Sequence, residues 1–220
     1  KRRMKSAGDL LSVVKTMKAL AAVSIRQYQR AVDSLRDYNR TVEMGLQIVL
    51  KERMGATMKR KNVPIKRLGV IVFGSDQGLC GQLNEQISTF ALDHIKSTGV
   101  KKENRKVLSV GARVADYVED AGQTVDELLS TPGSTAGITP LVQEIIMIID
   151  EWHFRGNVDH FFLFYNEYLT GATYHPHMLQ LLPVDEGWLK HIAGQKWESK
   201  SLTIFRMYDE KIFSSLIREY

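Results

Sequence analysis

The chain has 220 residues, of which 44% are hydrophobic and 25% are charged, with a formal net charge of +5 and a mean hydropathy of −0.20. We expect a globular protein that does not cross a bilayer, because no apolar run approaches the roughly 20 residues that a span requires, and no apolar core of a signal peptide follows Lys1 to Lys5. The single cysteine, Cys80, excludes an internal disulfide framework and any cysteine-based zinc site, and predicts a reducing, intracellular compartment.

The first predicted element, residues 1–61, carries the positive charge. It holds 15 of the 30 Lys and Arg residues but only 5 of the 25 Asp and Glu residues, so the rest of the chain is net acidic. This asymmetry predicts two parts with different partners, and the basic part suits an acidic protein, a phosphate or a membrane surface. Nucleic acid is an alternative, although no aromatic residues are interleaved for base stacking and no DNA-binding motif is present.

Apolar or small residues recur in steps of three and four from Ala7 to Val49, which is typical of a coiled-coil seam. The seam includes Val14, Ala21, Tyr28, Leu35 and Tyr38. A helix of some 50 residues would be about 75 Å long, too long to bury its stripe on a compact domain, so we expect a partner helix. The alternative is a helix that folds back on its own domain, with a break near Gly45.

Residues 62–200 predict a second domain in which strands and helices alternate. We expect strands at 67–73, 106–110, 124–129 and 158–165, an extended segment at 174–184, and helices at 81–97, 112–120 and 139–154. Thr139 is the expected cap of the last of these helices, with Pro140 in its first turn. Alternation of this kind predicts an α/β fold with a Rossmann-like, mainly parallel sheet covered on both faces.

Residues 201–220 predict the beginning of a C-terminal helix, which is still running at Tyr220 without a Gly or Asn cap. We expect that the chain is cut short here, and that the continued helix is the natural partner of the first one. Without that partner, the exposed seam can pair with another copy, and we expect aggregation or a domain-swapped dimer as readily as a monomer.

The turn 74–81 lies between a strand and a helix, where an α/β sheet binds a phosphate or a dinucleotide. Its glycines match neither the dinucleotide fingerprint nor the P-loop, and a tight turn explains them. A nucleotide-dependent enzyme of Rossmann type, with the first helix as a dimerisation arm, is the alternative function that this turn leaves open.

Other candidate chemistry is sparse. Cys80 could be activated at a helix N-terminus, but we expect a buried structural thiol because no motif supplies a histidine partner. His175 and His177 would share one face of a strand, as metal ligands do, but no third ligand is evident. Loop solvation explains the acidic pairs 150–151 and 185–186, and helix-end packing explains His153. We therefore predict no catalytic residue, cofactor or metal.

Three stretches of the sequence resemble the gamma subunit of the F-type ATP synthase. The first is the opening R-R-M-K-S with K-T-M-K-A-L-A-A at 15–22, and the second is the turn S-D-Q-G-L-C-G, formed by Ser75, Asp76, Gln77, Gly78, Leu79, Cys80 and Gly81. The third is F-Y-N-E-Y at 164–168 with L-Q-L-L-P at 179–183. Gln77 stands where many members have Arg or Lys, and the loop 131–139 is atypical, so this chain resembles a divergent or alternative branch.

The resemblance implies a non-catalytic rotor shaft with no bound cofactor. Its partners would be the alpha and beta subunits around the coiled coil, and the epsilon subunit and c-subunit ring at the α/β domain, with no nucleic acid and no membrane span of its own. Met17 and Lys18 would contact beta. The protein would be a peripheral subunit on the cytoplasmic face of the inner or plasma membrane, or on the matrix or stroma side in an organelle.

Overall fold

The structure, a computed structural model, describes residues 2–53, 64–169, 173–197 and 216. The chain separates into two compact units: Lys1–Ala56 together with His191–Tyr220, and Thr57–Lys190. No helix within the described ranges combines the length and apolar character needed to cross a bilayer.

The first unit is built on one uninterrupted helix, α1 (Arg2–Arg53), of 52 residues. At 1.5 Å per residue it is about 78 Å long. It is continuous because no proline precedes Pro64, and neither Gly8 nor Gly45 breaks it. The expected long helix is confirmed as far as Arg53, and the expected continuation to residue 61 lies outside the described residues.

The second unit contains a five-stranded sheet with the order β3-β2-β1-β4-β5. Its strands are β1 (Leu68–Phe73), β2 (Arg105–Val110), β3 (Glu127–Leu129), β4 (His160–Tyr168) and β5 (Tyr174–Leu182). The pairs β1–β2, β2–β3 and β1–β4 are parallel, and only β4–β5 is antiparallel. The strand order reverses between β1 and β4, as in a doubly wound Rossmann-like sheet, so the α/β fold with a mainly parallel sheet is confirmed.

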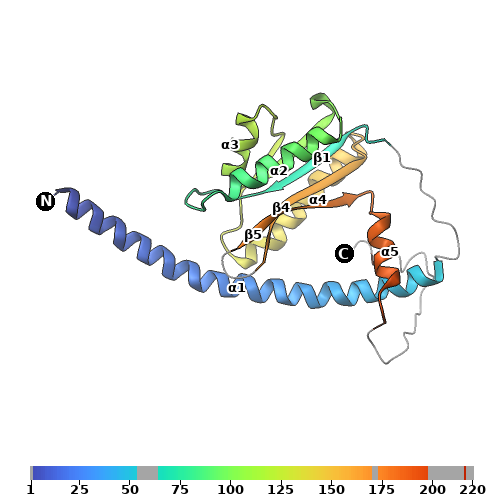
Figure 1. The fold of residues 1–220 in the computed structure, drawn as a ribbon, viewed down its shortest axis with the longest axis horizontal. Helices are drawn as coiled ribbons and strands as arrows, with labels where there is room; N and C mark the ends of the chain where they lie inside the picture. The colour runs from blue at the N-terminus through green and yellow to red at the C-terminus, as the bar shows by residue number, and fades with distance from the viewer. Residues whose placement is uncertain (1, 54–63, 170–172, 198–215, 217–220) are drawn as a thin grey trace. The chain divides into compact units, whose positions relative to one another are not determined.

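Helices cover both faces of this sheet (Figure 1). The first face packs against α2 (Leu83–Ser97) and α3 (Ala112–Asp120), in a core that includes Val70, Ile87 and Phe164. The second face packs against α4 (Ile138–Phe154), in a core that includes Ile71 and Trp152. Burial on both faces explains why β1 is a continuous apolar run rather than an alternating one.

Two helix starts differ from the sequence expectation. α2 begins at Leu83 rather than residue 81, because Leu79 and Gly81 have positive φ angles of 65° and 62° and cannot join the helix. α4 begins at Ile138 with Gly137 as its N-cap, so the prediction that Thr139 is the cap was wrong. Pro140 is tolerated as the third helical residue because the amides of the first turn have no intrahelical acceptor.

One helix was missed, α5 (Glu186–Gly194), which spans the division between the two units. Asp185 caps it, since its carboxylate accepts hydrogen bonds from the backbone amides of Gly187 at 3.2 Å and Trp188 at 2.9 Å. The interpretation of the acidic pair at 185–186 as loop solvation was therefore wrong for Asp185.

The expected helix at 201–220 lies outside the described residues except for Leu216, which is helical. The expected boundaries between domains, after residues 61 and 200, remain predictions.

Candidate functional site

The first candidate surface is the predicted seam of α1. Between residues 11 and 38 its large apolar side chains are about half exposed: Val14 is 52%, Met17 46%, Leu35 56% and Tyr38 47% exposed. Ala21 is exposed as well, and Tyr28 is half-buried. Because single domains rarely leave so long an apolar stripe in water, the stripe indicates an interaction surface.

Further along α1 the apolar stripe becomes buried. Val42, Leu46 and Val49 are buried, and the side-chain amide of Gln47 donates a hydrogen bond to the backbone carbonyl of Gln195. At Gly45 a Cβ atom would lie 3.1 Å from Cδ2 of Leu216. Glycine at this seam position therefore admits Leu216 close to the helix backbone, as expected if the C-terminal segment pairs with α1.

Met17 and Lys18 are adjacent and exposed on α1. Six basic side chains of this helix are exposed: Lys15, Lys18, Arg26, Arg30, Arg36 and Arg40. The ion pair between Arg36 and Asp33 is long, at 3.9 Å. Such exposed charges contribute little to the stability of the helix itself and are available to an acidic partner. The contact of Met17 and Lys18 with a beta subunit remains a prediction.

The second candidate surface is the turn between β1 and α2, which we call the motif turn (residues 75–81). Asn84, a buried residue of α2, makes three hydrogen bonds to this turn. Its side-chain oxygen accepts from the Ser75 backbone amide at 2.9 Å. Its side-chain amide donates to the Ser75 hydroxyl at 2.9 Å and to the Cys80 sulfur at 3.3 Å. The Ser75 hydroxyl donates in turn to the carbonyl of Gln77 at 2.7 Å. The Cys80 thiol is thus part of a structural network, which supports a structural role. It is only partly buried, so the expectation of a fully buried thiol was wrong.

Asp76 connects the motif turn to two other segments. One carboxylate oxygen accepts a hydrogen bond from the Ala112 amide at 2.9 Å, at the first residue of α3. The other accepts from the amide and the hydroxyl of Thr131, at 2.7 and 2.6 Å, in the loop that follows β3. Burial alone would raise the pKa of Asp76, but these three hydrogen bonds outweigh it and lower the pKa below its ordinary value of 3.8.

Glycines allow these segments to approach each other. Gly111 has a φ angle of 117°, and a Cβ atom there would lie 2.8 Å from the backbone nitrogen of Ser75. A Cβ atom at Gly74 would lie 2.5 Å from Cβ of Val114. Three backbone amides at this edge, those of Ser75, Ala112 and Thr131, already donate to side chains of the protein itself.

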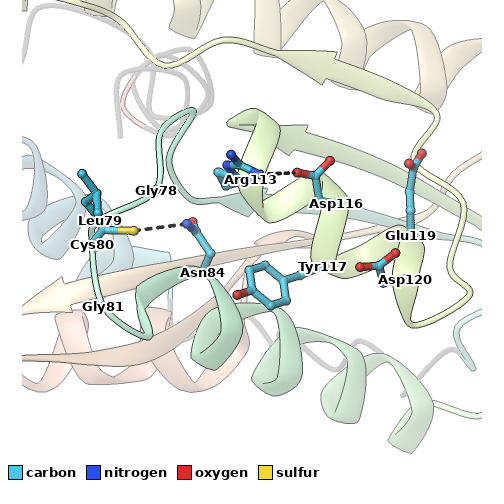
Figure 2. A pocket seen from close by; sticks show the side chains of 10 residues that line it. All are labelled: Gly78, Leu79, Cys80, Gly81, Asn84, Arg113, Asp116, Tyr117, Glu119 and Asp120. Atoms are coloured by element: carbon cyan, nitrogen blue, oxygen red, sulfur yellow. Dashed lines mark hydrogen bonds and ion pairs between the residues drawn. The ribbon is translucent and has the colours of Figure 1, made fainter. Parts of the chain in front are cut away.

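Beside the motif turn lies a cavity of about 580 Å³ (Figure 2). Gly78 to Gly81 and Asn84 form one wall, and α3 forms the other with one cation and three carboxylates: Arg113, Asp116, Glu119 and Asp120. Arg113 is itself engaged by Asp116 at 3.3 Å. This acidic wall would repel a nucleotide phosphate, so the geometry does not favour the alternative of a nucleotide-dependent enzyme.

The structure supplies a third neighbour for His175 and His177, which the sequence interpretation lacked. Glu167 on β4 lies opposite His175 on β5 in the antiparallel register. Its carboxylate is 3.3 Å from Nε2 of His175 and 3.7 Å from Nδ1 of His177. Sequence reasoning does not find Glu167, because strand pairing in the β4–β5 hairpin, and not proximity along the chain, places it beside the two histidines. The available signal was the pair of histidines two residues apart on one strand.

Comparisons with known proteins agree over most of the chain. A family model described as ATP synthase matches residues 1–220. Two curated relatives are the ATP synthase gamma chains of Desulfitobacterium hafniense, 26% identical over 100% of this chain, and of Pasteurella multocida, 25% identical over 84% of it. The chain spans 74% and 64% of the lengths of these two relatives.

Among solved structures, a chain of the central stalk and c-ring of the Tetrahymena thermophila mitochondrial ATP synthase is similar in fold, with a TM-score of 0.51 and 14% identity over 90% of each chain. The structural likeness concerns the fold alone.

Proposed function

We propose that this chain, which belongs to the ATP synthase family, is the gamma subunit that serves as the central rotor shaft of that complex. The observation that carries the proposal is the match of the family model to residues 1–220, together with curated relatives that are ATP synthase gamma chains. The shaft couples ion flow through the membrane sector to ATP synthesis or hydrolysis on the beta subunits.

The properties of α1 support a shaft. A continuous helix of 52 residues, about 78 Å long, can transmit torque, and its half-exposed apolar stripe can pack against a second helix and the inner surface of a ring of alpha and beta subunits. The exposed basic side chains on its other faces suit acidic loops of beta, with contacts that can form and break at each rotational step.

The α/β domain would contact the epsilon subunit and the c-subunit ring, and the protein would be a peripheral subunit of a membrane-associated complex. It contributes no catalytic residue, because the chemistry takes place on beta. The motif turn fits a structural role in such a domain, since Asp76, Asn84 and Gly111 fasten the ends of β1, β2 and β3 together.

The test is ATP hydrolysis by purified alpha and beta subunits with and without this chain. We expect the chain to co-elute with the assembly and to raise the hydrolysis rate. Leu35→Glu, on the seam, should abolish co-elution, whereas Gln29→Glu, one position past the seam residue Tyr28, should leave it intact. Absence of both binding and stimulation, or saturable binding of ATP to the isolated chain, would contradict the proposal.

A further inference from the structure

Three potential ligand groups converge on the β4–β5 hairpin. They are the carboxylate of Glu167 and one ring nitrogen each of His175 and His177, and these ligand atoms all lie within 4.8 Å of one another. The side chains are 47%, 45% and 40% exposed, so an ion from solvent can reach them.

The hairpin itself creates this arrangement. His175 and His177 are two residues apart on β5, so their side chains lie on the same face of the strand. Glu167 pairs with His175, and Tyr165 pairs with His177, across the antiparallel ladder. Residues paired across two strands share a face, and this places the carboxylate beside both imidazoles.

The spacing fits a tetrahedral metal ion. Zinc lies about 2.0–2.2 Å from nitrogen and oxygen ligands, which in a tetrahedron puts neighbouring ligand atoms about 3.3–3.6 Å apart. The two distances from Glu167 to the histidine nitrogens, 3.3 and 3.7 Å, are already close to this separation. Two histidines and one glutamate are also a ligand set that zinc uses with a fourth position left for water.

A divalent ion would give the Glu167 carboxylate and both neutral imidazoles one shared partner. The Tyr165 ring lies against that of His177, with centroids 5.2 Å apart, and supports the orientation of this imidazole.

We propose that Glu167, His175 and His177 bind one divalent transition-metal ion of the zinc class, with water as the fourth ligand. The ion joins β4 to β5 at the edge of the sheet. Because the three groups come together only in the folded hairpin, the ion stabilises the fold.

The test is calorimetric titration of the 220-residue chain with Zn²⁺, together with visible spectra after addition of Co²⁺. We expect one ion per chain, with a dissociation constant below about 100 μM, and cobalt bands typical of tetrahedral coordination. His175→Gln, His177→Gln and Glu167→Gln should each weaken binding at least about tenfold. His191→Gln, which removes an exposed histidine of α5, is the matched control and should bind as the wild type does.

Circular dichroism of each variant establishes that it is folded, and the melting temperature gives a second measurement. Zn²⁺ should raise the melting temperature of the wild type and of His191→Gln but not that of His175→Gln/His177→Gln. Two results would overturn the proposal. One is the absence of saturable binding at millimolar Zn²⁺, and the other is equal affinity in the double variant.

Discussion

Asp76 illustrates how one side chain organises the motif turn. Its two carboxylate oxygens accept three hydrogen bonds from segments that lie 36 and 55 residues further along the chain. A carboxylate suits this place because all three groups facing it are donors, two backbone amides and one hydroxyl. The residue therefore joins the end of β1 to the start of α3 and to the loop after β3.

We predict that Asp76→Asn lowers the free energy of unfolding by about 1–3 kcal/mol. The asparagine side chain has an NH₂ group where Asp76 has an acceptor oxygen, so this NH₂ group would face a hydrogen-bond donor instead of an acceptor. Urea denaturation at pH 7 measures the change. The matched control is Asp116→Asn on α3, where the carboxylate is exposed and pairs only with Arg113 at 3.3 Å; we expect a loss below about 1 kcal/mol. Equal losses of unfolding free energy in the two variants would show that the hydrogen bonds of Asp76 stabilise the fold no more than an exposed ion pair does.

The same substitution should change the pH dependence of stability. Since folding lowers the pKa of Asp76, its contribution is fully present above its ordinary pKa of 3.8 and is lost as the pH falls through the lower value of the folded state. The side-chain amide introduced by Asp76→Asn cannot titrate, so the acid-side slope should be shallower in the variant. The variant should keep some slope of stability against pH on the acid side, because the pKa of Asp159 is also lowered in the folded state. Burial alone would raise the pKa of Asp159, but hydrogen bonds from His160 and from the Arg67 backbone amide outweigh burial.

At the level of single residues, the sequence predicts local features better than contacts. The motif turn is recognisable because its residues are contiguous, and Cys80 lies in the structural network that its lack of a histidine partner suggests. The partners of Asp76 are not recognisable, since Ala112 and Thr131 reach it only through the sheet. Glu167 was missed as a neighbour of His175 for the same reason, because strand pairing, not chain proximity, brings them together.

At the level of elements, the periodicity of α1 predicts both its length and its exposed stripe. Most of the stability of a helix in a protein comes from packing along one face, and the described part of that packing lies toward the C-terminal end of α1, near Gly45 and Leu216. The N-terminal portion around Val14 therefore depends on the continuity of the backbone hydrogen bonds and on a partner.

We predict that Val14→Pro breaks α1. Proline removes the amide that bonds to the carbonyl of Leu10 and clashes with that turn, at a local cost of about 3 kcal/mol. Far-ultraviolet circular dichroism should show a loss of helix, and the variant should no longer stimulate the assembled alpha and beta subunits. Val14→Ala keeps a good helix former and is the control for the lost side chain. Unchanged helicity in Val14→Pro would mean that α1 is not continuous at this point.

The existence of an element was predicted well where its apolar periodicity and its length indicate the same type of structure, and the positions of its ends were predicted less well. β1 and α3 follow from their apolar patterns, whereas the starts of α2 and α4 depend on backbone angles at Leu79, Gly81 and Gly137 that the pattern does not reveal. α5 was missed although Asp185 three residues before Trp188 is a recognisable capping signal. Its nine residues were too few for a clear period of 3.6 to emerge.

For the whole molecule, the separation of charge is the property that links sequence to function. The basic residues concentrate on α1, whereas the cavity beside the motif turn has an acidic wall. A basic shaft and a net acidic domain suit two different sets of partners. This agrees with the proposal that α1 faces the beta subunits and that the α/β domain contacts the rest of the rotor.

We predict that Lys18→Glu impairs coupling without unfolding the chain. Lys18 lies next to the seam residue Met17 and is exposed, so reversing its charge should leave the helix intact but repel an acidic loop of beta. In the assembled complex in membrane vesicles, ATP-driven ion pumping per ATP hydrolysed should fall several-fold. Lys18→Gln removes the attraction without adding repulsion, so its ion pumping per ATP hydrolysed should lie between those of the wild type and Lys18→Glu.

Arg26→Glu is the control. It reverses a charge that points away from the seam and should couple as the wild type does. Because both reversals change the net charge of α1 equally, a defect shared by Lys18→Glu and Arg26→Glu would assign the effect to overall charge. Full coupling in Lys18→Glu would exclude Lys18 from the contact with beta.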